Sequence, residues 1–276
     1  MHAIKSLISH LGSRFALKDL GSLHYFLGIE VSKVADGSLH LSQTKYINDL
    51  LRRTDMTAKA QPTPILSTLR LQQDDFTVVS DATLYRSVVE ALQYILITRP
   101  DLSYAMNKAC QFMHNPQDHH WKAVKRILCY LAGTTNHGLL IKHNSHSSIL
   151  GFANVDWGTD LDDRKSTTRY AVFLGSNILS WSSHKQKVVI QSSTKAEYKS
   201  IATVLADIIW LLALLNELHI HPSLPKIFFD NLGAVLLSAN PIMHSRTKHF
   251  QLDMHFVRDY VQRRKCLWFN FLHDIK

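Results

Sequence analysis

The sequence predicts a mixed α/β protein in two parts: a mostly helical part that contains a β-hairpin, and then a layered α/β domain. Residues before about 143 show helical stripes of apolar side chains and one strong hairpin signal. After a polar, nonperiodic run, short β-rich segments are followed by a long apolar helix and another strand. Strands before and after a helix in this order are typical of an α/β layered domain. We place the boundary in the run 143–148, which gives domains 1–145 and 146–276.

The first part is predicted to begin with a helix and a hairpin. Apolar residues at helical spacing predict the helix over Ala3–Phe15. The two strands of the hairpin are expected at Tyr25–Val34 and Ser38–Leu41. Asp36-Gly37 lies between them and favours a tight turn, because glycine tolerates a positive φ.

Further helices and one long loop are predicted before the boundary. Ser42 is expected to cap a helix that ends near Arg53, and the stretch 57–81, which contains two prolines, is expected to be a loop. An apolar stripe predicts the next helix, and Pro100 is expected to open the helix after it. The stripe consists of Leu84, Val88, Leu92 and Ile95.

The last helix of this part is predicted over about Asp118–Leu131 and has a basic face. Its cations are Lys122, Lys125 and Arg126. An exposed basic face is usually only solvated, but this one is also able to follow a phosphate backbone. The sequence leaves both interpretations open.

The second part is predicted to begin with strands and to end with helices. Ser176-Asn177 is expected to turn the middle pair of strands, and a long apolar helix is expected from Lys195 to about Leu218. Two more helical stretches are expected to finish the chain. The predicted strands are 149–155, 170–174, 178–182, 188–191 and, directly before Asp230, 226–229.

The composition indicates a polyanionic partner and a reducing environment. Lys and Arg total 31 against 22 for Asp and Glu, a net charge of +9, which favours nucleic acid first and an anionic membrane second. Three widely spaced cysteines argue against a disulfide framework. The most apolar run, Ile201–Leu215, is shorter than a membrane span and contains Asp207, so we interpret it as a buried helix. We therefore expect an intracellular protein, in the cytoplasm or nucleus, without a membrane partner.

Four carboxylates follow predicted strands or lie on predicted helices, and the ends of strands are where sites in α/β proteins are commonly built. They are Asp156, Glu197, Asp230 and Asp253. Carboxylates that converge can hold a divalent cation, because such ions prefer oxygen ligands. The alternative, and the usual case for acidic side chains, is a set of isolated surface carboxylates.

Longer stretches resemble one known family, in the family's own order and over almost the whole chain. KDLGSLHYFLGIEV at 18–31 is similar to the end of the reverse transcriptase palm in copia-type LTR retrotransposon Pol polyproteins. Three stretches resemble its thumb and connection, namely 41–51, 84–107 and 119–134. Three more resemble its ribonuclease H domain, namely 162–198, 229–241 and 244–259. The resemblance implies a truncated reverse transcriptase remnant in 1–145 and a ribonuclease H-like domain in 146–276.

The resemblance also implies a set of site residues. Ribonuclease H domains of this family hold two Mg²⁺ ions with four carboxylates, and the ions clamp both sides of the phosphate that is cut. The family pattern YSDADWAG matches FANVDWGT at 152–159, so Asn154 stands where the first catalytic carboxylate is expected. By the same matching, Glu197 is the second, Asp230 the third and Asp253 the fourth catalytic, metal-binding position.

Asn154 predicts an impaired nuclease. An amide oxygen can touch a metal ion, but it lacks the negative charge, so we expect one bound Mg²⁺ or none. Asp156 is a possible substitute because residues two apart on a strand share a face. It would be displaced by about 6.6 Å along an ideal strand, which is a large error for metal geometry.

Other positions bear on the polymerase and on nucleic acid. The paired-aspartate motif of the polymerase (YVDD-like) is absent, and Glu90 stands where the family pattern has glycine. If the backbone packs closely there, a buried charge is costly. Arg246, Lys248 and His249, like the basic helix, would either grip a phosphate or form a solvated patch.

The resemblance implies metal-dependent endonucleolytic cleavage of RNA in RNA–DNA hybrids as the ancestral activity. The implied partners are an RNA–DNA hybrid and other portions of the Pol polyprotein. The alternative is a non-catalytic hybrid-binding module, or a decaying fragment of the element.

Overall fold

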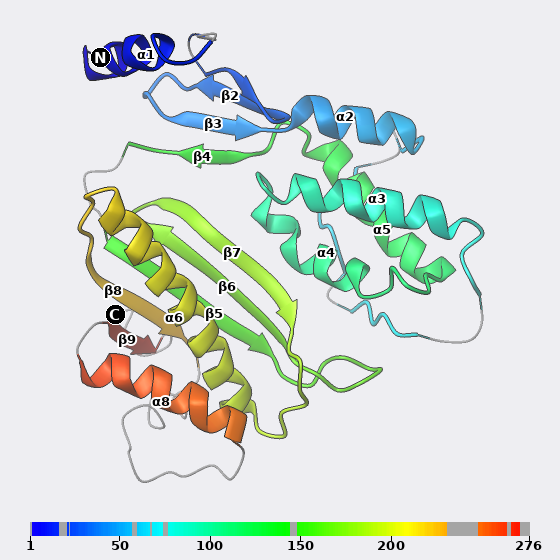
Figure 1. The fold of residues 1–276 in the computed structure, drawn as a ribbon. Helices are drawn as coiled ribbons and strands as arrows, with labels where there is room; N and C mark the ends of the chain where they lie inside the picture. The colour runs from blue at the N-terminus through cyan, green and yellow to red at the C-terminus, as the bar shows by residue number, and fades with distance from the viewer. Residues whose placement is uncertain are drawn as a thin grey trace.

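The computed structural model describes residues 2–16, 21, 23–56, 60–66, 68–73, 77–143, 148–230, 248–263 and 266–270. Within them the chain forms two sheets and two large hydrophobic cores that share no residue (Figure 1). One large core lies among the helices of the first part, and the other lies under the sheet of the second part. The mixed α/β class predicted from the sequence is confirmed.

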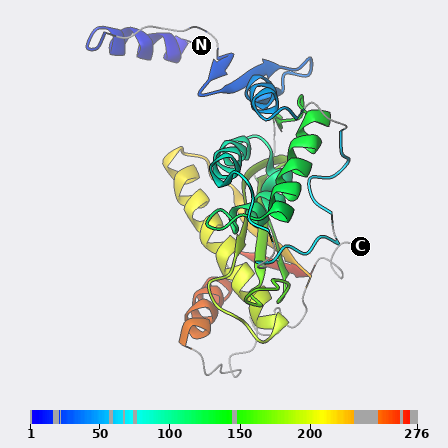
Figure 2. The same ribbon diagram turned by 90° about the vertical axis from the view of Figure 1, so that its right-hand side faces the viewer.

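A small antiparallel sheet joins the two ends of the first part. Its strand order is β1-β2-β3-β4, with bounds Tyr25–Phe26, Ile29–Lys33, Leu39–Ser42 and Leu139–Ile141. The hairpin prediction is confirmed: Gly37 has φ 84°, and the Asp36 carboxylate accepts a hydrogen bond from the Ser38 amide at 2.9 Å. Helix α1, His2–Gly12, lies at the edge of the molecule beyond this sheet (Figure 2).

The helices of the first part pack their apolar stripes against one another. They are α2 (Thr44–Arg53), α3 (Ala82–Ile95), the 3₁₀ turn η1 (Pro100–Leu102), α4 (Ser103–Cys110) and α5 (Asp118–Gly133). Arg99, at the boundary of η1, is 1% exposed and donates to the carboxylate of Asp101 and to the Thr134 carbonyl oxygen. This buried cation ties the start of η1 to the end of α5.

A five-stranded sheet forms the second part. Its strand order is β7-β6-β5-β8-β9, antiparallel from β7 to β5 and parallel from β5 to β9. The strands are β5 (Ser148–Asp156), β6 (Thr167–Leu174), β7 (Asn177–Lys185), β8 (Ser223–Phe229) and β9 (Leu267–Asn270). Two helices accompany them, α6 (Ser193–Glu217) and α8 (Lys248–Gln262).

Helix α6 covers one face of this sheet, with α8 beside it (Figures 1 and 2). The approach to β5 is close: a Cβ at Gly151 would lie 2.8 Å from the Ile208 Cδ1 atom, so a larger residue there would push the end of the Ile208 side chain aside. Within the described residues, α6 is the one helix long and apolar enough to cross a membrane. One side of α6 fills the core against β5, β6 and β8, as predicted, whereas Trp210 on its other side is 61% exposed.

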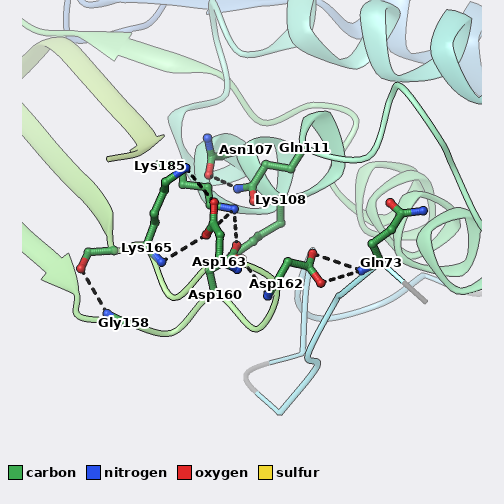
Figure 3. A network of polar contacts seen from close by, with 11 residues as sticks. Gln73, Asn107, Lys108, Gln111, Gly158, Asp160, Asp162, Asp163, Lys165 and Lys185 are labelled. Carbon is green, nitrogen blue, oxygen red and sulfur yellow. Dashed lines mark hydrogen bonds and ion pairs between the residues drawn. The ribbon is translucent and has the colours of Figure 1, made fainter. Parts of the chain in front are cut away.

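Polar contacts fix the loop between β5 and β6 against the first part (Figure 3). The buried Asp160 carboxylate lies 3.8 Å from the Lys108 ammonium of α4 and 2.9 Å from the Lys185 ammonium of β7. Asp162 accepts from the Gln73 amide at 2.9 Å. These contacts join three segments that are distant in the sequence, and they position the end of β5.

Several local predictions were wrong. Gln43, not Ser42, precedes α2, because Ser42 still pairs in β3. Leu84 is exposed at the start of α3. The turn after β6 is Gly175-Ser176, residues 188–191 are not a strand, and β9, which was not predicted, follows α8. Of the two helical stretches expected after Asp230, α8 is one, and residues 231–247 lie outside the described residues. Glu90 is exposed, so no charge is buried there. The boundary at 145/146 lies outside the described residues.

Candidate functional site

Asn154 lies near the C-terminal end of β5, on the face of the sheet that α6 does not cover. Its neighbour Ala153 is buried in the core under α6, and strand alternation therefore turns Asn154 to the opposite face, where it is exposed. Its backbone is held from the helix side, because the Ser200 hydroxyl donates to the Asn154 carbonyl oxygen at 3.2 Å. The side-chain amide is free to meet a ligand.

Asp230 and Asn154 line the same groove. The parallel register pairs Phe152 of β5 with Phe228 of β8, and two residues further on each strand come Asn154 and Asp230. A groove of about 620 Å³ contains both side chains, with an apolar floor that includes the stacked rings of Phe152 and Phe228. Adjacent strands lie about 4.8 Å apart, so the register brings the first and third predicted positions together.

Glu197 reaches the same end of the sheet from the first turns of α6. It is 6% exposed, and its Oε2 atom has no hydrogen-bond partner among the described residues. Burial, followed by the nearby Asp230 carboxylate, raises the pKa of Glu197 to about 8, while the Val155 backbone and the Arg169 guanidinium oppose the rise. Glu197 is therefore mostly protonated at neutral pH. It lies near Asp230, so the second and third predicted positions meet at this end of the sheet.

Asp253, the fourth predicted position, forms an ion pair with a lysine of α6. It lies on α8, and its carboxylate is 3.6 Å from the Lys199 ammonium of α6. Lys199 is two residues beyond Glu197, which on a helix is close to the opposite side. The described contacts thus bring together Asn154, Glu197 and Asp230, but not Asp253.

Asp156, the possible substitute, is engaged by Arg169. The Arg169 guanidinium donates to the Asp156 carboxylate at 2.5 Å, and Arg169 is also the cross-strand partner of Asn154 on β6. A cation therefore lies on the face where a metal ligand was predicted. Arg169 was not among the predicted site residues, although an arginine within the apolar and hydroxyl-rich run of β6 was a visible signal in the sequence.

These residues fit one divalent ion better than two. The orphaned Glu197 oxygen and the adjacent, exposed Asp230 offer two carboxylates. A second ion would need a charge at residue 154, where the side chain is a neutral amide facing Arg169. Among the described residues, no group of three or more His, Cys, Asp or Glu side chains is arranged to hold a metal ion.

The predicted basic residues have different surroundings. Lys122 and Lys125 are exposed on α5, and the Lys125 ammonium lies 5.7 Å from the Trp121 ring centroid. Arg126 is half-buried, and its guanidinium donates to the side chains of Gln61 and Thr63, so it holds the loop before α3. Arg246 and the side chains of Lys248 and His249 lie outside the described residues.

Comparison with known proteins identifies relatives along most of the chain. The family model for reverse transcriptase (RNA-dependent DNA polymerase) matches residues 1–67. The retrovirus-related Pol polyproteins from transposons RE2 and RE1 of Arabidopsis thaliana are 49% and 48% identical, each over 94% of this chain. The chain spans 18% of the length of each of these relatives.

Among solved structures, the chain is similar to the N-terminal ribonuclease H domain of a Mycobacterium tuberculosis protein. The identity is 11% and the TM-score is 0.33, over 46% of this chain and 86% of that chain. The chain belongs to the copia-type retrotransposon Pol polyproteins, and its residues 1–67 match their reverse transcriptase.

Proposed function

We propose that this chain binds RNA–DNA hybrids and that its second domain is an impaired, Mg²⁺-dependent ribonuclease H. The observation that carries the proposal is the meeting of Glu197 and Asp230 with an asparagine at the first catalytic position. The site keeps two carboxylates and lacks the charge that a second ion needs.

Glu197 and Asp230 are the residues that would hold one Mg²⁺, which supplies Lewis-acid activation of water and stabilisation of the leaving oxygen. Glu197 has to lose its proton to act as a ligand, which its raised pKa opposes at neutral pH. The Asn154 amide can orient a scissile phosphate, and the Arg169 guanidinium beside it can neutralise part of its charge.

A non-catalytic hybrid-binding module is the second candidate, and Arg169 favours it. The guanidinium gives this face of the sheet a resident cation without any metal, and it is 38% exposed. Together with Lys122 and Lys125 it offers contacts to phosphates that do not depend on chemistry at Glu197.

Cleavage of labelled RNA in a hybrid, measured with and without Mg²⁺, tests the proposal. Asp230→Asn is the matched variant, because it removes one charge with little change of shape. We expect slow, Mg²⁺-dependent cleavage that Asp230→Asn abolishes, with hybrid binding retained in both proteins. Binding without any cleavage would favour the second candidate. Cleavage that is unchanged in Asp230→Asn, or a folded chain that does not bind the hybrid, would contradict the proposal.

A further inference from the structure

A second cavity lies where the two parts of the chain meet. Its volume is about 330 Å³, near the lower end of the roughly 300–1,000 Å³ typical of small-molecule sites. Three segments form it: the loop around Leu69 to Leu71, helix α4 through Tyr104 and Lys108, and the β5–β6 region. We call it the interface pocket.

The charges of the interface pocket suit an anion. Its lining includes three cations, Arg70, Lys108 and Arg169, and one carboxylate, Asp156. Arg70 is exposed and has no ion pair within the described part of the chain. Lys108 has only a long contact of 3.8 Å to Asp160, whose carboxylate lies closer to another lysine.

The cations gather around one tyrosine. The Arg169 guanidinium lies 4.8 Å and the Lys108 ammonium 6.0 Å from the Tyr104 ring centroid. Arg70 is near enough to act on the Tyr104 hydroxyl electrostatically. The Arg169 Nη2 atom donates to Asp156, while its buried Nε atom has no hydrogen-bond partner in the described part of the chain. Guanidinium groups bind phosphate oxygens in pairs, so two arginines beside one lysine form a phosphate-binding set.

The remaining lining is apolar and suits a flat group. Leucine and isoleucine side chains of the loop and of the β5–β6 region face the cavity beside the Tyr104 ring. Nucleobases pack on aromatic rings, on guanidinium planes and on aliphatic side chains. These apolar residues are Ile65, Leu66, Leu69, Leu71 and Leu161.

We propose that the interface pocket binds a nucleoside phosphate, with the phosphate on Arg70, Lys108 and Arg169 and the base against Tyr104 and the leucines. The ligand is either a free nucleotide or one nucleotide of a bound strand. The pocket is distinct from the groove at Asn154, although Arg169 lines both. It therefore exists whether or not Glu197 and Asp230 support cleavage.

Calorimetric titration of the whole chain with adenosine 5′-monophosphate tests this, with adenosine and inorganic phosphate as partial ligands. We expect the monophosphate to bind at least about tenfold more tightly than either part. Arg70→Ala and Lys108→Gln should each weaken it about tenfold or more, equivalent to about 1.4 kcal/mol. Arg263→Ala is the matched control: it removes an exposed arginine directly after the end of α8, outside the pocket, and should have no effect.

Binding of a labelled hybrid and of a labelled single strand by the same variants shows whether the ligand is a free nucleotide or part of a strand. If Arg70→Ala weakens binding of a strand and the monophosphate competes with it, the ligand is part of a strand. If strand binding is unchanged while monophosphate binding is lost, the ligand is a free nucleotide. Either result supports the pocket. No saturable binding of the monophosphate, or equal binding by the folded Arg70→Ala protein, would overturn it, even where hybrid binding and cleavage persist.

Discussion

The raised pKa of Glu197 predicts a specific dependence of stability on pH. The pKa is about 8 in the folded chain against an ordinary value of 4.5, so at pH 7 the carboxyl is protonated when folded and ionised when unfolded. The stability that this proton contributes is complete below pH 4.5 and is lost as the pH rises through 8. Burial lowers the pKa of His184, so the stability linked to this side chain rises with pH, but it does so below about pH 6.5.

Its magnitude follows from one proton released on unfolding. Below pH 8 the free energy of unfolding falls by about 1.4 kcal/mol for each rise of one pH unit, and the fall levels off as the folded carboxyl ionises. The total loss from pH 7 to pH 9 is therefore about 1.4 kcal/mol. Glu197→Gln keeps the shape and removes the titration. Urea unfolding of both proteins at pH 7, 8 and 9 should show the variant gaining this amount relative to the unchanged chain. Parallel curves for the two proteins would refute the placement of Glu197 as a buried carboxyl beside Asp230.

Three further predictions concern the polymerase part, the basic helix and the buried arginine. Purified chain should incorporate no nucleotide on a primed template, because the paired-aspartate motif that binds polymerase metals is absent from this sequence; template-dependent incorporation would contradict this. Hybrid affinity should fall with salt at a log–log slope of about −0.9 per contacted phosphate, and the double change Lys122→Ala, Lys125→Ala should make the slope shallower by about 2; an unchanged slope would remove α5 from the interface. Arg99→Met should lower the free energy of unfolding by about 3 kcal/mol, because the Asp101 carboxylate and the Thr134 carbonyl oxygen lose the buried cation that donates to them. A loss below about 1 kcal/mol in urea unfolding would contradict that role.

Local patterns in the sequence predicted the elements whose determinants are local. The hairpin at Gly37, the helix after Pro100 and the buried α6 all follow from turn chemistry or from the spacing of apolar residues. Strand β9 was missed because it pairs in parallel with β8 across an intervening helix, and no short-range pattern encodes such a contact. The start of α2 was misplaced because pairing of Ser42 in β3 overrides its preference for a cap.

The candidate site was only partly predictable for the same reason. Family patterns identified Asn154, Glu197 and Asp230, and the described structure brings these three to one end of the sheet. Arg169 escaped notice because its place opposite Asn154 depends on the β5–β6 register, which a ten-residue loop leaves undetermined in the sequence. The interface pocket was equally hidden, since its cations come from three segments far apart in the chain.

We propose that the missing charge at residue 154 limits the nuclease activity. An aspartate there would lie beside Asp230 in the groove, at the position where the family pattern has a carboxylate. Asp156 already has Arg169 as its partner, which leaves a new carboxylate at 154 available for an ion. Asp156→Asn is the control, because it abolishes any residual cleavage only if Asp156 has taken over the lost role.

The most direct measurement is the single-turnover rate of Mg²⁺-dependent cleavage of an RNA–DNA hybrid by the unchanged chain and by Asn154→Asp. Changes next to metal ligands typically cost 10–100-fold in activity, and loss of a ligand itself should cost more. We expect Asn154→Asp to raise the rate at least about 100-fold, which is about 2.7 kcal/mol of transition-state stabilisation. An unchanged rate in a folded Asn154→Asp protein that still binds the hybrid would contradict it.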